Sequence, residues 1–216
     1  MQITTFRRVV RACALPLTLT ITLLAGCSRA DNPYAKIADG PLVTGTLHTV
    51  TFATDDATLV ARLEKDGYSV LSFAPNYQAA IHVESLLWDV PEDVAGKVAI
   101  LKAPAGAPDL RVLTMAPKPP APAADSAVLR DFYRNVLGTD VPRWPAKVAR
   151  ADNVRVQVWT YLIPDVLGAR RKLREHAIPT ASEPVAITTP YLGDEKILTL
   201  NAPDGVIVEL VQTAAQ

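Results

Sequence analysis

Short runs rich in apolar and β-branched residues recur along the chain after residue 46, and such runs favour β-strands. In the first half these runs cover residues 47–54, 68–73, 97–102 and 110–115. Between the first two runs, Leu59 and Leu63 stand four residues apart, as residues on one face of a helix do. Gly67 then supplies the left-handed residue with which many helices end. We therefore predict a helix over residues 55–66 and the element order βαβββ, with an irregular excursion over residues 76–96.

The second half of the chain repeats this order. Strands are predicted over residues 154–162, 185–188, 195–200 and 206–211. Pro164 and Asp165 begin a predicted helix that ends near Ala177. The spacing agrees, because Asp55 to Gly67 and Asp165 to Ala177 both span 12 residues (67 − 55 and 177 − 165). An internal repeat of this kind indicates two copies of one supersecondary unit.

A proline-rich stretch and one helix separate the two repeats. Residues 117–122 (PKPPAP) form a stiff connector, and the apolar residues of 126–138 recur at helical spacing before Gly138. We therefore predict an α+β fold made of two βαβββ modules. The predicted boundaries are 46–117 for the first module, 118–152 for the connector and 153–216 for the second module.

The N-terminus has the pattern of a bacterial export signal. Three arginines precede an uncharged apolar run over residues 12–24, which is too short to span a bilayer as a stable helix. The run ends in Leu24-Ala25-Gly26-Cys27, which resembles the bacterial lipobox. This resemblance implies that residues 1–26 are a lipoprotein signal peptide, and that Cys27 carries a covalent lipid of the diacylglyceryl and palmitate type.

The lipidated cysteine implies a location as well as a modification. Residues 27–45 are polar and broken by Pro33, Gly40 and Pro41, so they are predicted to be a tether between membrane and domain. Ser28 follows the cysteine in place of the Asp that usually retains lipoproteins in the inner membrane. We therefore expect a protein of the cell envelope, lipid-anchored at the periplasmic face of the outer membrane.

The charge balance narrows the range of partners. After loss of residues 1–26 the chain has 216 − 26 = 190 residues, with 22 − 3 = 19 basic and 22 acidic side chains, or a net charge of −3. A mildly acidic chain argues against a nucleic-acid partner, whose phosphates require clustered Lys and Arg. Cys13 leaves with the signal peptide and Cys27 is acylated, so no intramolecular disulfide is expected.

Three phrases of the sequence carry a family resemblance. PDGVIVEL at residues 203–210 fits a hairpin between two last strands, and LHTV at 47–50, with Asp55 seven residues after its histidine, fits a first strand and helix start. DFYRNVLG at 131–138 fits a helix phrase, although here it lies in the connector. Together the phrases resemble the vicinal-oxygen-chelate superfamily, which includes glyoxalases, extradiol dioxygenases and the fosfomycin- and bleomycin-resistance proteins.

The resemblance implies a cleft in which a divalent metal, such as Zn, Fe, Mn or Ni, binds two neighbouring oxygens of a substrate. It places His48 at the ligand position of the first strand and Glu209 at that of the last strand. Counting back seven residues from Asp165 reaches Val158, which is no ligand. Gln157, one residue earlier, would point to the other face unless a bulge intervenes.

The fourth position, on the last strand of the first module, falls near Leu113 or Thr114, and neither is a strong ligand. The candidate metal set is therefore His48 and Glu209, with Gln157 as the third member. His48 is also compatible with a histidine that binds no metal, and Glu209 with a solvent-facing residue of an edge strand.

Three aromatic residues are candidates for stacking on a ligand in the cleft: Trp159, Tyr161 and Tyr191. Aromatic residues on strands are more often part of the core. Two functions remain open, namely a small-molecule binding protein without metal, and a metal-dependent lyase, isomerase or dioxygenase. An envelope scaffold is a third. The lack of a strong third ligand favours the binding protein, and enzyme status is left open.

Overall fold

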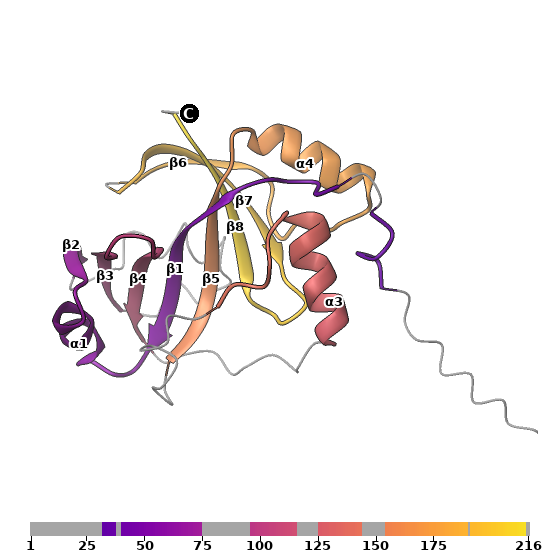
Figure 1. The fold of residues 1–216 in the computed structure, drawn as a ribbon. Helices are drawn as coiled ribbons and strands as arrows, with labels where there is room; N and C mark the ends of the chain where they lie inside the picture. The colour runs from indigo at the N-terminus through magenta and orange to yellow at the C-terminus, as the bar shows by residue number, and fades with distance from the viewer. Residues whose placement is uncertain are drawn as a thin grey trace, which may run out of the picture. The chain divides into compact units, whose positions relative to one another are not determined.

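The computed structural model describes residues 32–37, 40–74, 96–115, 125–143, 154–189 and 191–214. Their eight strands form one mixed sheet in the order β2-β3-β4-β1-β5-β8-β7-β6 (Figure 1). β1 and β5 are neighbours at the centre of the sheet, and each is the first strand of one βαβββ module. The α+β fold with two such modules, which the apolar runs and the repeat predict, is therefore confirmed.

The first module contains five elements. Its bounds are β1 (Thr46–Thr54), α1 (Leu59–Lys65), β2 (Ser69–Ala74), β3 (Lys97–Lys102) and β4 (Asp109–Thr114). The strands β2, β3 and β4 are antiparallel neighbours, and β4 returns parallel to β1. The helix begins later than residue 55, because Asp56 first makes a turn: its backbone N–H donates to Thr54 Oγ1 at 3.0 Å and its Oδ1 accepts from the N–H of Thr58 at 2.8 Å.

The second module repeats this arrangement. Its bounds are β5 (Val154–Leu162), α4 (Val166–Glu175), β6 (Val185–Thr189), β7 (Gly193–Asn201) and β8 (Ile207–Thr213). The strands β6, β7 and β8 are antiparallel neighbours, and β8 runs parallel to β5. The side chain of Asp165 caps α4 by accepting from the N–H of Gly168 at 2.9 Å.

The main core lies between the sheet and the helices. Alternate residues of the strands face this core, together with one side of each helix. Its buried members include Val50, Phe52, Leu59, Leu63, Leu110, Phe132, Trp159, Tyr161, Val166, Leu173, Leu198 and Leu210. The strand residues between them point to the opposite face, where a second, smaller apolar cluster is buried: Ala53, Val98, Leu113, Val158, Ile197 and Val211.

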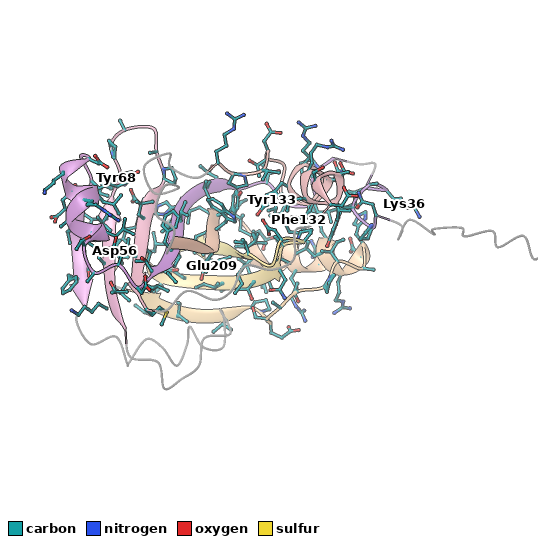
Figure 2. All side chains as sticks on the ribbon, turned by 90° about the horizontal axis from the view of Figure 1, so that it is seen from below. Lys36, Asp56, Tyr68, Phe132, Tyr133 and Glu209 are labelled. Atoms are coloured by element: carbon teal, nitrogen blue, oxygen red, sulfur yellow. The ribbon has the colours of Figure 1, made fainter. Side chains whose placement is uncertain are left out.

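The connector contributes one helix to the main core. It begins as α3 (Ser126–Asp131), capped by Asp125, and continues as the π-helical turn η1 (Phe132–Val136). Phe132 and Tyr133, labelled in Figure 2, are buried. The phrase DFYRNVLG lies on this element and not on the helix after β1, as its position in the sequence indicates.

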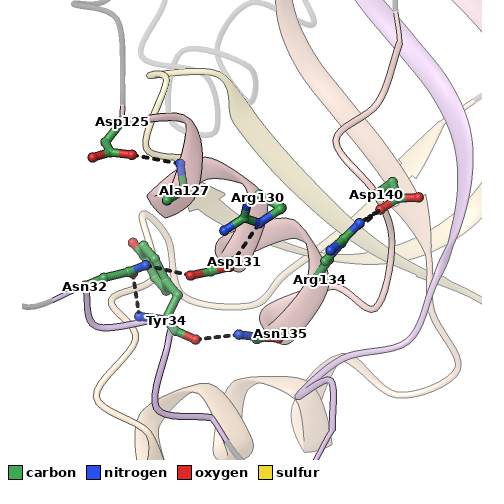
Figure 3. A network of polar contacts seen from close by, with 9 residues as sticks. All are labelled: Asn32, Tyr34, Asp125, Ala127, Arg130, Asp131, Arg134, Asn135 and Asp140. Atoms are coloured by element: carbon green, nitrogen blue, oxygen red, sulfur yellow. Dashed lines mark hydrogen bonds and ion pairs between the residues drawn. The ribbon is translucent and has the colours of Figure 1, made fainter.

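The segment before β1 packs against the connector helix through side chains. Asn32 Nδ2 donates to Asp131 Oδ2 at 2.8 Å, and Asn135 Nδ2 donates to the carbonyl of Tyr34 at 2.7 Å (Figure 3). The ring of Tyr34 meets Phe132 edge to face, with 5.2 Å between the centroids.

Backbone contacts extend this packing toward β1. The N–H groups of Leu42 and Val43 donate to the carbonyls of Asn135 and Val136 at 3.1 and 2.9 Å. Ile37, Leu42 and Val43 are buried in the main core. The described part of the predicted tether over residues 27–45 is therefore docked onto the domain, because apolar side chains between the prolines and glycines pack into the main core. A tether between membrane and domain stays a prediction.

Three predictions concern residues outside the described part of the chain. These are the signal peptide with its lipobox, within residues 1–31, nearly all of the irregular excursion over 76–96, and the stiff connector over 117–122. Among the helices of the described residues, none is both long and apolar enough to cross a membrane.

Candidate functional site

A line of polar residues crosses five neighbouring strands on the sheet face that points away from the helices. Pairing places Asp109 beside Thr49, Thr49 beside Thr160, Thr160 beside Glu209, and Glu209 beside Thr199. We call these five residues the polar row. All are between 0% and 3% exposed. Because burying polar groups is costly unless they find partners, the polar row is the strongest candidate for a functional feature.

His48 lies at the first-module end of the polar row. It is an extra residue of β1 between Leu47 and Thr49, where the pairing with β5 shifts register. A bulge of this kind can re-aim a side chain. The imidazole lies on the same face as Thr49, with 2.7 Å between His48 Nδ1 and Thr49 Oγ1, and 5.5 Å between its centroid and that of Tyr191.

Asp109 gathers three donors at this end of the row. The hydroxyl of Tyr191 and the Nζ of Lys102 donate to its Oδ2, the latter at 3.0 Å, and the N–H of Ala103 donates to its Oδ1 at 2.9 Å. Burial alone would raise the pKa of Asp109, but the hydrogen bonds from Tyr191, Ala103 and Lys102 outweigh it and lower the pKa. The structure therefore holds this carboxylate in its charged form.

The two rings beside Asp109 are held neutral. Burial is the main cause that lowers the pKa of His48, although the Asp109 carboxylate opposes it. Burial, followed by the hydrogen bond to Asp109, raises the pKa of Tyr191 well above its ordinary value. A neutral imidazole and a phenol are suited to accept and donate hydrogen bonds to a polar ligand.

Glu209 lies at the second-module end of the polar row, within the sheet (Figure 2). Its Oε2 accepts a hydrogen bond from Thr160 Oγ1 at 2.7 Å. The hydroxyls of Thr199, in the next strand, and of Thr51, two residues along β1 from Thr49, are buried without a hydrogen-bond partner among the described residues. Each could donate to a ligand on this face without losing an existing bond.

A local two-fold relation between the modules explains which residues correspond. In β5, Gln157 is the extra residue at the second register shift, as His48 is in β1. An offset of 109 residues separates the two bulge residues (157 − 48 = 109). The same offset separates Thr51, near the first bulge residue, from Thr160, near the second (160 − 51 = 109). Thr51 pairs with Arg111 in β4, and Thr160 pairs with Glu209 in β8. Arg111 is therefore the counterpart of Glu209.

These pairings correct two of the sequence-based positions. The last-strand position of the first module is Arg111, and neither Leu113 nor Thr114. The counterpart of His48 is Gln157, and not Val158. The seven-residue count failed because Asp56, and not Asp55, matches Asp165 at the start of the helix (165 − 56 = 109). Gln157 could take the ligand position only if a bulge intervened, and β5 has a bulge at this residue. The side chain of Gln157 lies outside the described part of the structure.

The candidate metal set can be tested against this arrangement. Within the described residues, no three His, Cys, Asp or Glu side chains gather in a way that could hold a metal ion. The fourth position carries the cationic Arg111, whose charge acts on His48, Tyr191 and Glu195. A guanidinium repels a divalent cation and donates hydrogen bonds only. The described side chains thus do not make a metal site by themselves.

An open hollow of about 470 Å³ lies over the second module. Its lining residues belong to β6, β7 and β8, together with the residue that follows β8: Ala186, Ile187, Thr188, Asp194, Glu195, Lys196, Gln212, Thr213 and Ala214. Glu195 lies on the same face as Glu209, two pairs along β7 from Thr199. Burial is the main cause that raises the pKa of Glu195, and the nearby Glu209 adds to it. This residue therefore connects the hollow with the polar row.

The aromatic candidates divide between the two faces. Trp159 and Tyr161 are 3% and 1% exposed and belong to the main core, so their alternation with Thr160 turns them away from the polar row. Tyr191 instead joins His48 and Asp109. Sequence reasoning missed Asp109, Arg111 and the threonines of the row. A threonine at alternate positions of a strand was the available signal, but it is common on any solvated sheet face.

Comparisons with known proteins give similarity in structure only. No family model and no curated protein sequence matches the chain. Methylmalonyl-CoA epimerase from Mycobacterium tuberculosis is 20% identical with a TM-score of 0.44, covering 81% of this chain and 91% of the epimerase. The Streptomyces coelicolor epimerase is 20% identical with a TM-score of 0.43, covering 80% and 99%. A hypothetical protein from Bacillus halodurans is 14% identical with a TM-score of 0.43, covering 80% and 96%.

Proposed function

We propose that this chain is a lipid-anchored protein of the cell envelope whose paired βαβββ domain binds a small molecule without a metal ion. The single observation that carries the proposal is the polar row, a buried line of hydrogen-bonding side chains on the sheet face that the helices leave free. The hydroxyls of Thr199, in this row, and of Thr51, on the same face, have no hydrogen-bond partner among the described residues, and an open hollow lies over the second module.

The chemistry of this face indicates a polar ligand of modest size. The hollow has a volume within the range of small-molecule sites, roughly 300–1,000 Å³. Glu195 lines it, and the hydroxyls of Thr51 and Thr199 supply donors beside the Glu209 carboxylate. A ligand rich in hydroxyl or carbonyl oxygens would satisfy these groups, since each buried hydroxyl without a partner costs about 1–3 kcal/mol.

Arg111 is the reason for proposing a site without metal. It stands on β4 where the local two-fold relation would place a second Glu209, and its charge reaches His48 and Glu195. A fixed guanidinium supplies positive charge to this face and binds oxygen atoms of a ligand through hydrogen bonds. It therefore supplies part of the positive charge that a metal ion would supply in such a cleft.

One observation favours the second candidate function, a metal-dependent lyase, isomerase or dioxygenase. His48 and Gln157 are counterparts, each at a bulge, and Glu209 stands on a strand next to β5. If a metal were bound, these three residues would hold it, and it would act as a Lewis acid on adjacent substrate oxygens.

Metal content distinguishes the two candidates. The chain from Ser28 onward is purified, incubated with Zn²⁺, Mn²⁺, Fe²⁺ or Ni²⁺, freed of excess ion and assayed by elemental analysis, beside His48→Ala and Glu209→Gln. We expect far less than one ion per chain in all three proteins. Near-stoichiometric metal that both substitutions remove would overturn the metal-free proposal and support the enzyme.

The anchor has its own test. The full chain and Cys27→Ser are expressed in a Gram-negative host, and the processed N-terminus is analysed by mass spectrometry. We expect the wild-type chain in the membrane fraction, beginning at Cys27 with diacylglyceryl and acyl masses added, and the variant without them. An unmodified Cys27 in the mature wild-type chain would refute the anchor.

A further inference from the structure

The outward side of α4 carries concentrated positive charge. Four of its ten residues are basic, namely Arg170, Arg171, Lys172 and Arg174, against one acidic residue, Glu175. The mature chain as a whole has a net charge of −3 (19 − 22, from 22 − 3 = 19 basic and 22 acidic side chains). The basic charge is therefore a local property of this helix.

The helix is amphipathic in a way that leaves this charge outside. Val166, Ala169 and Leu173 are buried and fix α4 to the core. The opposite stripe contains Leu167, 56% exposed, with Arg171 and Arg174 four and seven residues later, both exposed. We call Leu167, Arg171 and Arg174 the α4 stripe. An exposed leucine followed by basic residues on one stripe is a feature of helices that lie at the surface of a membrane.

The docked segment before β1 and α4 pack into the same main core. The docked segment before β1 contributes Ile37, Leu42 and Val43 to the main core, which also contains Val166 and Leu173 of α4. Figure 1 shows this segment passing between α4 and α3, and Figure 3 shows it beside α3. Chain that enters the domain here enters it next to the α4 stripe.

The reach of the anchor is short. Only five peptide steps separate Cys27 from Asn32 (32 − 27), and Asn32 is fixed to Asp131 by a 2.8 Å hydrogen bond. An extended chain of that length spans at most roughly 17 Å. If Cys27 carries the lipid, this end of the domain cannot leave the neighbourhood of the headgroups.

We propose that the α4 stripe rests on an anionic lipid surface and orients the lipid-anchored domain, an inference that rests on the proposed lipidation of Cys27. The arginines bind headgroup phosphates and Leu167 enters the interfacial region. The sheet face with the polar row is opposite to the face that the helices cover. The bilayer therefore does not cover the candidate site.

Vesicle binding of the unlipidated chain from Ser28 onward tests the surface without the anchor. Sedimentation is measured at low ionic strength with vesicles of phosphatidylcholine alone and with phosphatidylglycerol added. We expect binding only to the anionic vesicles. Arg171→Gln/Arg174→Gln should weaken it about 25-fold, since each basic residue near such a surface contributes roughly a factor of five.

A matched control separates the α4 stripe from charge in general. Lys65→Gln/Lys97→Gln removes two exposed positive charges from α1 and β3, and should bind as the unchanged chain does. An equal loss in both variants, or no binding to anionic vesicles by a chain with unchanged circular dichroism, overturns the proposal. Binding that depends on the α4 stripe in a protein whose Cys27 proves unmodified supports the surface and refutes only the anchor.

Discussion

β4 and β8 occupy equivalent places in the two modules, yet Arg111 stands on one where Glu209 stands on the other. The backbone relation extends to irregular features, because β1 and β5 each carry one extra residue at the same offset. Around these shared positions the chemistry differs. Asp109 of the first module accepts from Lys102 and Ala103 of its own module and from Tyr191 of the second module, whereas Glu209 is flanked by threonine hydroxyls.

This comparison shows which part of a repeated unit is fixed by folding. The residues that face the helices must stay apolar in both modules, because each module depends on the shared core. The residues on the other face are not needed for that core, so they can differ between modules. A symmetric fold therefore provides an asymmetric site, with a cation from one module and a carboxylate from the other.

Arg111→Glu should break the asymmetry with the largest effect. It would place a second carboxylate opposite Glu209, and with His48 it supplies three side chains of the type that binds divalent metals. We expect affinity for Co²⁺ to rise at least about 100-fold over the unchanged chain, which is about 2.7 kcal/mol. The visible absorption of bound Co²⁺ measures it.

Two variants keep that result interpretable. Arg111→Gln removes the cation without adding a carboxylate, and should bind Co²⁺ weakly. Adding His48→Ala to Arg111→Glu should abolish the gain. A gain that survives the loss of the imidazole would show that the metal binds elsewhere, and the equivalence of Arg111 and Glu209 would then have no chemical meaning.

Tyr191→Phe tests the hydrogen bond by which Tyr191, of the second module, stabilises the Asp109 carboxylate of the first. The phenol donates to the charged Asp109, and hydrogen bonds to charged groups contribute about 1.5–3 kcal/mol, so we expect a loss of about 2 kcal/mol in urea unfolding at pH 7. The pKa of Asp109 is lowered on folding. Its stabilisation is therefore complete above the ordinary Asp pKa and is lost as the pH falls through the lower folded value.

The loss from Tyr191→Phe should shrink under acid for that reason. Tyr133→Phe is the matched control, since the Tyr133 hydroxyl is buried and has no hydrogen-bond partner among the described residues. Its removal should be neutral or slightly stabilising. Equal losses from the two substitutions would mean that packing of the ring, and not the bond to Asp109, determines the result.

Thr160→Val sharpens the description of the second module with a smaller effect. The Thr160 hydroxyl donates to Glu209 at 2.7 Å, so we expect its loss to lower the free energy of unfolding by about 1–2 kcal/mol. Thr51→Val removes the counterpart hydroxyl, which has no partner among the described residues, and should leave stability unchanged or raise it. A cost as large at residue 51 would show that its hydroxyl has a bonded role in the free protein.

Glu195→Gln should give the smallest effect, visible mainly in its pH dependence. Burial raises the pKa of Glu195 on folding. The stability that this residue contributes is complete below the ordinary Glu pKa, about 4.3, and is lost as the pH rises through the folded value. The amide cannot ionise, so the variant should gain stability over the unchanged chain as the pH rises above the ordinary Glu pKa. Glu64→Gln, on the exposed side of α1, removes a carboxylate far from the hollow and is the control.

The fold was largely predictable, and the site was not. Alternation along β1 and β5 and the helix caps are local, so a window of several residues contains the signal for each element. The bulges at His48 and Gln157 are different, because an extra residue is defined only against the neighbouring strand. Missing it shifted the assignment from Gln157 to Val158, and the place of Arg111 could not be derived at all.

Contacts distant along the chain were equally hidden. Tyr191 reaches Asp109 across 82 residues, and nothing near either residue in the sequence marks the pair. The orientation of Trp159 and Tyr161 was hidden for a related reason: in a strand with polar and apolar residues on both sides, composition alone does not show which face the helices cover.

The docked segment before β1 also determines how the domain responds to mechanical load. Tension applied to the chain before Asn32 would reach the contacts of Asn32 and Tyr34 with the connector helix first. The backbone bonds of Leu42 and Val43 to Asn135 and Val136 come next, before β1 is loaded. Because these contacts lie outside both βαβββ modules, the segment can detach from the connector helix under load while the sheet stays intact.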